Sequence, residues 1–387
     1  MSDPRQLARD GVEYLRRGDP ASARRAFEAI ASGGVEDPAV KVALAIACRA
    51  LGDTTAALAA SNQALALAPR DARALLLKAD LLADGGDRQG AAAFYLEAVR
   101  VAESQPDLAG LPPADVKRAR EACEAVGAAI ERSVRGVLGS GLTNAGGRFS
   151  ESLDILFGHR RQYFQQPRYY FFPGLAPIQF FPSDMFPWLE DLEKATEEIQ
   201  GELQGVLASH AHAFRPYVQS DPSRPQRSQD GLVDNPNWSA FYLWKNGSRV
   251  EENIALCPRT AAAVARLPLA ELPKRSPSVL FSLLKPGAHI PPHCGLVNTR
   301  LIGHLPLIVP PGCSFRVGNE TRDWREGKAW VFDDTIEHEA WNRSDRTRVI
   351  LLFEVWRPEL TPAERSAVQS LFSALDATGA NSKDWEI

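Results

Sequence analysis

The sequence predicts an α+β protein in which a helical repeat region precedes a β-rich domain of the jelly-roll or cupin type. The composition changes along the chain, because residues 1–137 contain no tryptophan and no histidine, whereas all eight tryptophans and all seven histidines follow. A 34-residue spacing recurs in the first part, and short apolar stretches separated by turn signals fill the chain from residue 279 onward. We therefore expect a helical domain over residues 1–137, a linker over 138–150 and a β-rich domain over 151–387.

The overall composition is that of a globular protein, with 44% hydrophobic and 24% charged residues among 387. The net charge of -4 gives no basis for expecting nucleic acid or an anionic membrane as a partner. No apolar run approaches the roughly 18 residues that cross a bilayer, and the first residues lack the features of a signal peptide. The five cysteines show no CxxC spacing, so we expect a cytoplasmic protein without a disulfide framework or a structural zinc site.

Three Gly-Asp pairs punctuate the first part of the chain. They are Gly18-Asp19, Gly52-Asp53 and Gly86-Asp87, spaced 34 residues apart, and each lies between two apolar-periodic stretches. Glycine ends one helix and aspartate caps the next, so each pair predicts a helix-turn-helix unit. Alanine recurs five residues after each glycine, at Ala23, Ala57 and Ala91, where two helices must approach closely. The region resembles the tetratricopeptide repeat over residues 5–103, and a further helix over 112–137 is expected to cap the stack.

The role of these repeats is open between two interpretations. Such repeats stack into a solenoid with a concave face, which favours a groove that binds an extended segment of a peptide or protein substrate. The alternative is a scaffold that packs on the second domain and shields it. No residue in the repeats identifies a ligand, so both interpretations stand.

Between the linker and residue 279, the sequence predicts three helices and one strand. The helices are expected over residues 152–166, 187–211 and 261–267, and the strand over 238–244, with a turn at 246–247. Aromatic residues at 169–172 and 180–181 are expected to cover the open side of a sheet. His210 and His212 are not expected to form a metal site, because residues two apart on a helix do not share a face.

Short apolar stretches beyond residue 279 predict the strands of a double-stranded β-helix. They cover residues 279–284, 289–293, 300–309, 314–317, 328–332, 339–341 and 347–355. His293 ends one of these strands, and His338 precedes another by one residue. In a barrel of this kind the two imidazoles converge on one metal ion, and imidazole suits iron, zinc, copper and nickel alike. The residue two positions after His293 is Gly295, so the carboxylate of the usual non-haem iron triad is missing.

Arg348 lies in a late apolar strand, where an arginine is costly unless its guanidinium meets an acid. Pointing into the barrel, it suits a ligand carboxylate, to which Ser282 adds a hydroxyl. Arg300 and His304 are four residues apart on one strand, so they share a face and suit a second acid group. The alternative for each residue is an internal ion pair with Glu339, Glu354 or Asp333. Convergence of these side chains on one barrel favours the carboxylate pocket.

Several motifs resemble those of the aspartyl/asparaginyl β-hydroxylase family of Fe(II)- and 2-oxoglutarate-dependent dioxygenases. They include LKPGAHIPPHCG at 284–295, NTRLIGH at 298–304, FDDTIEHE at 332–339 and VWRPELT at 355–361. The resemblance extends over residues 152–371. Members of the family hold the iron with two protein ligands, so the resemblance implies that His293 and His338 bind Fe(II) and that Gly295 is compatible with a complete site.

The same resemblance implies 2-oxoglutarate as co-substrate and O2 as oxidant. Ser282 and Arg348 would take the distal carboxylate of 2-oxoglutarate, and Trp238 and His304 would shape or bind the co-substrate. We expect Arg300 to bind the co-substrate together with these residues, as a second positively charged side chain of the pocket. Catalysis would then depend on His293, His338 and Arg348.

One position departs from the family pattern. Well-known members often carry a second arginine two residues after the one that matches Arg300, and this chain has Ile302 there. The departure weakens the expectation that an acidic side chain lies next to the iron. The leading hypothesis is hydroxylation of an unactivated C–H bond, the β-carbon of an Asp or Asn residue in a peptide or protein. The alternatives are a repeat adaptor whose barrel only senses a ligand, and a related oxygenase that acts on a small molecule or a lipid acyl chain.

Overall fold

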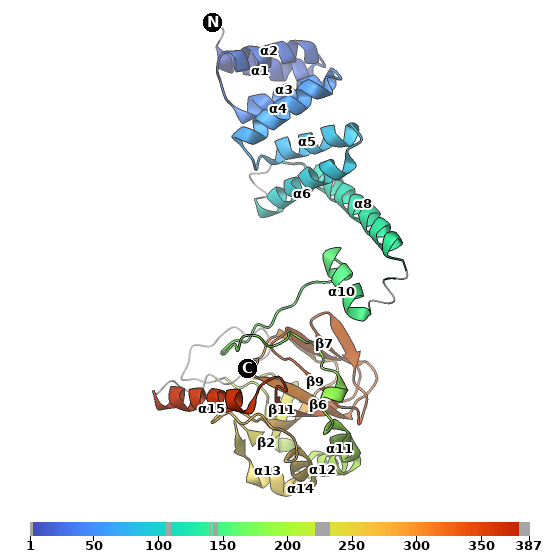
Figure 1. Ribbon diagram of the computed structural model, residues 1–387, viewed down its shortest axis with the longest axis vertical. Coiled ribbons are helices and arrows are strands. Elements are labelled where there is room, and N and C mark those ends of the chain that lie inside the picture. Colours follow the sequence, from blue (N-terminus) through green and yellow to red (C-terminus); the bar gives the residue numbers. More distant parts are fainter. Residues whose placement is uncertain (1–2, 106–109, 140, 142–145, 221–232, 379–387) are drawn as a thin grey trace. The chain divides into compact units, whose positions relative to one another are not determined.

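The computed structural model describes residues 3–105, 110–139, 141, 146–220 and 233–378 (Figure 1). The chain divides into two compact units, Met1–His159 and Arg160–Ile387. We call them the repeat unit and the sheet unit. The predicted linker over 138–150 lies partly outside the described residues, and the helix that begins at Gly147 belongs to the repeat unit.

In the repeat unit, each described helix from α1 to α6 packs on the next described helix along the chain (Figure 1). The helices of the unit are α1 (Pro4–Arg16), α2 (Pro20–Ser32), α3 (Pro38–Ala50), α4 (Thr54–Leu67), α5 (Ala72–Asp84), α6 (Arg88–Ser104), α8 (Pro113–Leu138) and α10 (Gly147–Leu156). The three predicted helix-turn-helix units correspond to α1–α2, α3–α4 and α5–α6, and α8 packs on α6 as the expected additional helix.

The Gly-Asp pairs have the predicted local structure. Gly52 adopts a φ of 76°, a left-handed conformation that glycine reaches without strain. The next residue, Asp53, caps α4 by accepting a hydrogen bond from the Ala56 N–H at 3.0 Å. Ala57 is 0% exposed, which confirms that the helices approach closely where the sequence places a small side chain. The other two repeats have the same glycine conformation, aspartate cap and buried alanine.

The sheet unit contains two antiparallel sheets. The larger has the strand order β1-β2-β4-β11-β6-β9, with β3 paired to β2, and the smaller has the order β5-β10-β7-β8. The strands are β1 (Arg215–Pro216), β2 (Trp238–Lys245), β3 (Ser248–Arg249), β4 (Val279–Leu284), β5 (His289–His293), β6 (Arg300–Ile308), β7 (Cys313–Val317), β8 (Glu320–Asp323), β9 (Trp330–Phe332), β10 (His338–Asn342) and β11 (Arg348–Trp356). This architecture confirms the predicted fold class, a helical repeat region followed by an antiparallel jelly-roll domain.

One face of the larger sheet packs against the smaller sheet, because Leu280 and Ile350 share a buried cluster with Phe315 and Ala340. Its other face is covered by helices, since Ile199 and Leu203 pack with side chains of β4 and β11. The covering elements are α11 (Leu189–Lys194), α12 (Thr196–Ser209), η2 (Ala211–Ala213), α13 (Glu251–Leu256) and α14 (Pro258–Val264). The short helix η1 (Ser183–Met185) precedes α11, and α15 (Pro362–Ala377) follows the last strand. The helices and the outer face of the larger sheet therefore enclose a hydrophobic layer, which closes that side of the space between the sheets to water.

Two predicted helices differ from the structure. The helix expected over 152–166 ends at Leu156, because the chain beyond it runs alongside the sheet unit and the backbone N–H of Gln166 donates to the Thr335 carbonyl at 2.7 Å. The helix expected over 187–211 is broken at Ala195 into α11 and α12. The strands β1, β3 and β8, the helices α13 and α15 and the short helices η1 and η2 were not predicted. No helix within the described ranges has the length and apolar content required to span a bilayer.

Candidate active site

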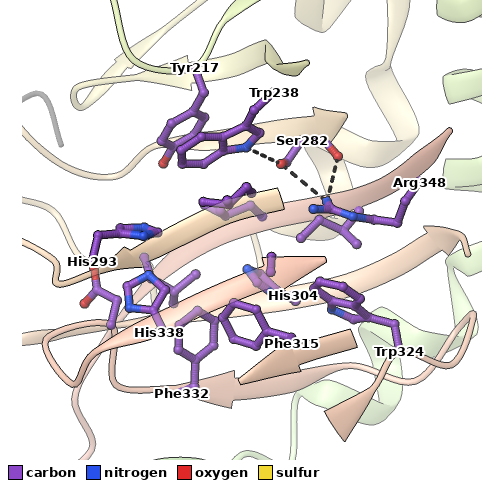
Figure 2. Close-up of a pocket in the computed structure, with 16 residues that line it drawn as sticks. Tyr217, Trp238, Ser282, His293, His304, Phe315, Trp324, Phe332, His338 and Arg348 are labelled. Carbon is purple, nitrogen blue, oxygen red and sulfur yellow. Dashed lines mark hydrogen bonds between the residues drawn. The ribbon is translucent and has the colours of Figure 1, made fainter. Parts of the chain in front are cut away.

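His293 and His338 face each other across two neighbouring strands. His293 ends β5 and His338 begins β10, and the antiparallel register pairs them directly. Their ring centroids are 4.1 Å apart, with the ring planes inclined at 54° (Figure 2). The structure thus brings together the two histidines that the sequence proposed as metal ligands.

Both rings are oriented by a backbone carbonyl two residues earlier. Nδ1 of His293 lies 2.8 Å from the Pro291 oxygen, and Nδ1 of His338 lies 3.0 Å from the Ile336 oxygen. A carbonyl accepts only, so Nδ1 carries the proton and donates it, which leaves Nε2 of each ring unprotonated. Burial lowers the pKa of His293 well below its usual range and that of His338 to about 4. Both imidazoles are therefore neutral at pH 7, the form that binds a metal.

The carboxylate of Asp334 occupies the space next to Gly295. A Cβ at position 295 would overlap that carboxylate, so the backbone here has room only for glycine. Asp334 is buried, its Oδ2 accepts a hydrogen bond from Arg300 at 2.9 Å, and its Oδ1 has no hydrogen-bond partner. Among the described residues, no three His, Cys, Asp or Glu side chains form a metal cluster. The described residues therefore provide two histidines and a nearby carboxylate that is already paired with Arg300, rather than a triad of three metal ligands.

A cavity extends from the histidine pair into the space between the two sheets (Figure 2). Its far end is formed by Arg348 and Ser282, and Trp238 lies between this end and His293. Trp238 Nε1 donates to Ser282 Oγ at 3.1 Å, and Arg348 Nη1 donates to the Ser282 carbonyl at 3.2 Å and lies 3.5 Å from Ser282 Oγ. The guanidinium also lies over the Trp324 ring, 4.8 Å from its centroid. The lining residues are Tyr217, Trp238, Ser282, Ile290, His293, Ile302, His304, Phe315, Trp324, Phe332, Asp334, His338, Ala340, Arg348, Ile350 and Leu352.

Arg348 differs from the other deeply buried arginines of the sheet unit. Arg275 pairs with Asp376 at 2.7 Å, Arg300 with Asp334 at 2.9 Å and Arg357 with Asp333 at 2.9 Å. Arg348 is 1% exposed, and no carboxylate among the described residues forms an ion pair with it. Burial lowers its pKa to about 10, so the guanidinium still carries its charge at pH 7. An unpaired buried cation is costly, and an anionic ligand would remove that cost.

His304 lines the cavity from β6. Its ring packs against Phe332 at 4.8 Å and Phe315 at 5.1 Å, and its Nδ1 is buried without a hydrogen-bond partner. Burial first, and then the charge of Arg348, lowers its pKa well below the usual range. The structure thus places His304 in the cavity lining as a neutral ring near Arg348, and its expected contact with the co-substrate stays a prediction.

The expected contact of Arg300 with the co-substrate is corrected by the structure. Arg300 is outside the lining, and its guanidinium lies between the carboxylates of Asp334, at 2.9 Å, and Glu354, at 3.2 Å. The alternative interpretation, an internal ion pair, therefore holds for this residue. Ile302, two residues along the same strand, does line the cavity.

Three lining residues with polar side chains were assigned no role from the sequence. Tyr217 follows a two-residue strand next to a polar stretch, and no periodic pattern marks it. Trp324 lies in a turn region after β8, a strand that the pattern did not reveal. Asp334 is adjacent to Asp333 in the motif around His338, and the sequence does not tell which of the two carboxylates faces the cavity.

Comparison with known proteins agrees with this geometry. The profile of the aspartyl/asparaginyl beta-hydroxylase family matches residues 193–358, and that of the tetratricopeptide repeat matches residues 10–66 and 42–107. The ornithine lipid ester-linked acyl 2-hydroxylase of Rhizobium tropici is 37% identical over 223 residues, which cover 55% of this chain and 74% of that enzyme. The chain belongs to the aspartyl/asparaginyl β-hydroxylase family.

Other members match a smaller share of their own length. Human aspartyl/asparaginyl beta-hydroxylase is 38% identical over 143 residues, 37% of this chain and 19% of that protein. Human aspartate beta-hydroxylase domain-containing protein 2 is 29% identical over 212 residues, 54% of this chain and 55% of that protein. Membership makes the protein a hydroxylase with tetratricopeptide repeats, and it implies Fe(II) and 2-oxoglutarate.

The residues of the cavity fit both groups. Two neutral imidazoles with unprotonated Nε2 atoms suit Fe(II), and a buried cation beside a serine hydroxyl suits one carboxylate of 2-oxoglutarate. Eight buried side-chain polar atoms of the described residues have no hydrogen-bond partner, and four of them belong to lining residues. These four are His304 Nδ1, Trp324 Nε1, Asp334 Oδ1 and Arg348 Nε. Unpaired polar atoms concentrated in one cavity indicate a site built for a polar ligand.

Proposed function

We propose that this protein hydroxylates an unactivated C–H bond with Fe(II), 2-oxoglutarate and O2. The observation that carries the proposal is Arg348, a buried arginine with no carboxylate partner at one end of a cavity whose other end holds two neutral histidines. In this assignment His293 and His338 bind Fe(II), while Arg348 and Ser282 bind the distal carboxylate of 2-oxoglutarate. Trp238 orients the serine hydroxyl through its indole N–H.

The bound cofactor and co-substrate supply the oxidation, in which one atom of O2 enters succinate, the other becomes the new hydroxyl, and CO2 is released. The protein supplies orientation and exclusion of water. Phe315 and Phe332 are 3% and 2% exposed and flank the rings of His304 and His338, so the interior of the cavity is apolar apart from the groups that bind the ligands.

The charges of the cavity limit the choice of substrate. Arg348 is the one lysine or arginine among the described lining residues, and 2-oxoglutarate would occupy it. Arg300 is already neutralised by two carboxylates, and Asp334 adds a negative group on the histidine side. Of the Asp and Asn residues in our leading hypothesis, an asparagine therefore suits the site better than an aspartate.

A lipid acyl chain is the second candidate substrate. The Rhizobium tropici relative, 74% of whose length is matched, carries the name of an acyl 2-hydroxylase. In this chain the lining positions Ile290 and Ile302 are apolar and offer a surface for hydrocarbon. The repeat unit supports the peptide candidate instead, because tetratricopeptide repeats suit an extended polypeptide, and we propose it as the site that holds such a substrate.

The test is succinate formation. Protein incubated aerobically with Fe(II), 2-oxoglutarate and ascorbate should release succinate, and a substrate should accelerate that release. His338→Ala should release none, whereas His289→Ala is a matched control, because His289 lies on the same strand as His293, outside the lining, and bonds Glu339 at 2.9 Å. Absence of succinate from the wild-type protein at saturating iron would contradict the proposal.

A further inference from the structure

Tyr217 is held in the cavity by contacts with Trp238. Its backbone N–H donates to the Trp238 carbonyl at 3.0 Å, and its ring stacks on the indole with centroids 4.2 Å apart and planes inclined at 13°. The indole in turn lies 6.0 Å from the His293 ring and donates to Ser282. Tyr217 is thus fixed to the same tryptophan that orients the serine of the co-substrate end.

The hydroxyl of Tyr217 lies on the histidine side of the cavity. Figure 2 shows the phenol oxygen toward His293, with Arg348 at the opposite end of the lining. None of the hydrogen bonds among the described residues involves this hydroxyl, although the ring is half-buried and lines the cavity. A polar group held in a hydrophobic stack without a partner is available for a ligand.

The groups around this hydroxyl narrow what the ligand can be. Ile290, Ile302 and Ala340 are apolar, and the Asp334 carboxylate repels a second negative charge. Burial, and then the proximity of Tyr242 and Glu354, keeps the pKa of Tyr217 well above its ordinary value, so the phenol keeps its proton and acts as a donor. In a lining whose one described lysine or arginine, Arg348, would be occupied by 2-oxoglutarate, a donor with apolar neighbours favours a neutral acceptor over an anion.

We infer that the Tyr217 hydroxyl donates a hydrogen bond to a neutral carbonyl oxygen of the substrate, on the carbon adjacent to the one that is hydroxylated. The substrate class is then a methylene next to an amide or ester carbonyl. This class includes the β-carbon of asparagine, which lies next to the side-chain amide, and the second carbon of an esterified acyl chain. The inference rests on the proposed function and names the feature that its two candidate substrates share.

The binding step involves no proton transfer to or from the phenol. The C–H bond is replaced by C–OH, 2-oxoglutarate is oxidised to succinate and CO2, and O2 is reduced, so the tyrosine is neither oxidised nor deprotonated. Its contribution is to hold the carbonyl, and with it the adjacent carbon, beside the histidine pair. Removal of the hydroxyl should therefore weaken substrate use and leave co-substrate binding intact.

The experiment compares Tyr217→Phe with Tyr242→Phe. Tyr242 stacks in the same series of rings, 6.4 Å from Tyr217, and lies outside the lining, so its variant removes a hydroxyl without touching the cavity. The probes are a library of capped peptides with a central asparagine, the same library with aspartate, and a fatty-acyl methyl ester in detergent micelles. Products are identified by mass spectrometry, and probe binding is measured by calorimetry with Mn(II) and the inert analogue N-oxalylglycine.

We expect the asparagine peptides or the acyl ester to be hydroxylated next to the carbonyl, and aspartate peptides to be poorer at pH 7.5. Loss of one neutral hydrogen bond in Tyr217→Phe should weaken probe binding and kcat/KM about 5- to 10-fold. N-oxalylglycine affinity should stay at the wild-type value in both variants, and succinate release without substrate should stay at the wild-type value in Tyr242→Phe. The probe that is hydroxylated shows whether the substrate carbonyl belongs to a peptide or to a lipid.

Three results would overturn the inference: Tyr217→Phe that equals wild type, a preference for aspartate, or no hydroxylation of any neutral probe. A preference for aspartate would direct attention to Arg168, an exposed cation whose backbone N–H donates to the Gly295 carbonyl at 3.0 Å. Failure of the proposed function has a different signature, because the wild-type protein would then release no succinate even without substrate.

Discussion

The repeat unit and the sheet unit place their charges differently. Among described residues of the repeat unit, Ser61 is the one buried polar residue, and the ion pairs, such as Arg24–Asp53, involve side chains that remain partly exposed. The described part of the sheet unit buries 21 polar or charged residues, including four arginines. The repeat unit is therefore held by short-range apolar contacts and helix caps, whereas the sheet unit contains buried charges that must each be compensated.

The exception among those buried charges identifies the site. Arg275, Arg300 and Arg357 meet carboxylates, which is the usual way to bury a guanidinium. Arg348 does not, and it lies in the cavity with the histidine pair. The cation that we propose as the co-substrate ligand is thus distinguished from the structural ones by the absence of an internal partner.

The largest expected effect concerns the histidine pair. His338→Ala removes one of two metal ligands, so we expect no detectable succinate and loss of Fe(II) or Mn(II) binding by calorimetry. The fold should persist, because the ring packs at the end of β10 rather than in the centre of a hydrophobic cluster. Turnover retained in this variant would remove the basis for assigning catalysis to the sheet unit.

Removal of an arginine that is paired with buried carboxylates should lower stability, in contrast to the loss of turnover expected for the histidine variant. Arg300→Met leaves the Asp334 and Glu354 carboxylates buried and unpaired, which costs about 3–5 kcal/mol of the free energy of unfolding. Because all eight tryptophans lie beyond residue 159, tryptophan fluorescence in urea reports on the sheet unit alone. A change below about 1 kcal/mol would show that this ion cluster is not structural.

The two units should also differ in their response to acid. Burial lowers the folded-state pKa of His338 from 6.5 to about 4, and it lowers the pKa of His293 and His304 as well. The unfolded chain therefore binds protons near pH 6.5 that the folded metal-free unit does not, so its stability falls as pH drops from 6.5 toward 4. His338 alone accounts for roughly 3 kcal/mol of that loss.

The repeat unit provides the control for this pH effect. It contains a single histidine, His159, in an exposed pair with Glu131. Urea unfolding at pH 7.5 and 5.0 should shift the tryptophan transition, while the helical signal of the repeat unit in circular dichroism shifts much less. Equal shifts in both signals would contradict the assignment of the acid sensitivity to the buried histidines.

The smallest expected effect lies in a helix cap. Asp53→Ala removes the acceptor of the Ala56 N–H at the start of α4 and should cost about 1 kcal/mol. The loss should appear in the circular dichroism transition, with the tryptophan transition and succinate formation unchanged. A change in turnover in this variant would show that the units are energetically coupled.

The sequence predicted local structure where a local rule was sufficient. Gly52-Asp53 specifies its turn and cap within a few residues, and β4 and β5 have the bounds that their apolar patterns predicted. The helix expected over 152–166 failed because Gln166 bonds a residue far along the chain, a partner that no local pattern reveals.

The candidate site could be located from the sequence for the same reasons and within the same limits. His293 and His338 stand in motifs, and Arg348 is conspicuous as a charge in an apolar strand. Arg300 looked equivalent by that criterion, yet Asp334 and Glu354, which neutralise it, come from segments 34 and 54 residues away. Tyr217 was not identified from the sequence, because Trp238, the residue whose ring holds it in the cavity, belongs to a different strand. Pairing between distant residues decides which polar groups remain available to a ligand.

The most direct test of this account measures 2-oxoglutarate affinity and stability together in Arg348→Met. The substitution removes the cation that lacks an internal partner, so we expect affinity to fall by about 2–5 kcal/mol, at least about 30-fold, with an unfolding free energy equal to or above that of wild type. The reverse outcome would contradict the account: unchanged 2-oxoglutarate affinity with a loss of stability as large as that of Arg300→Met.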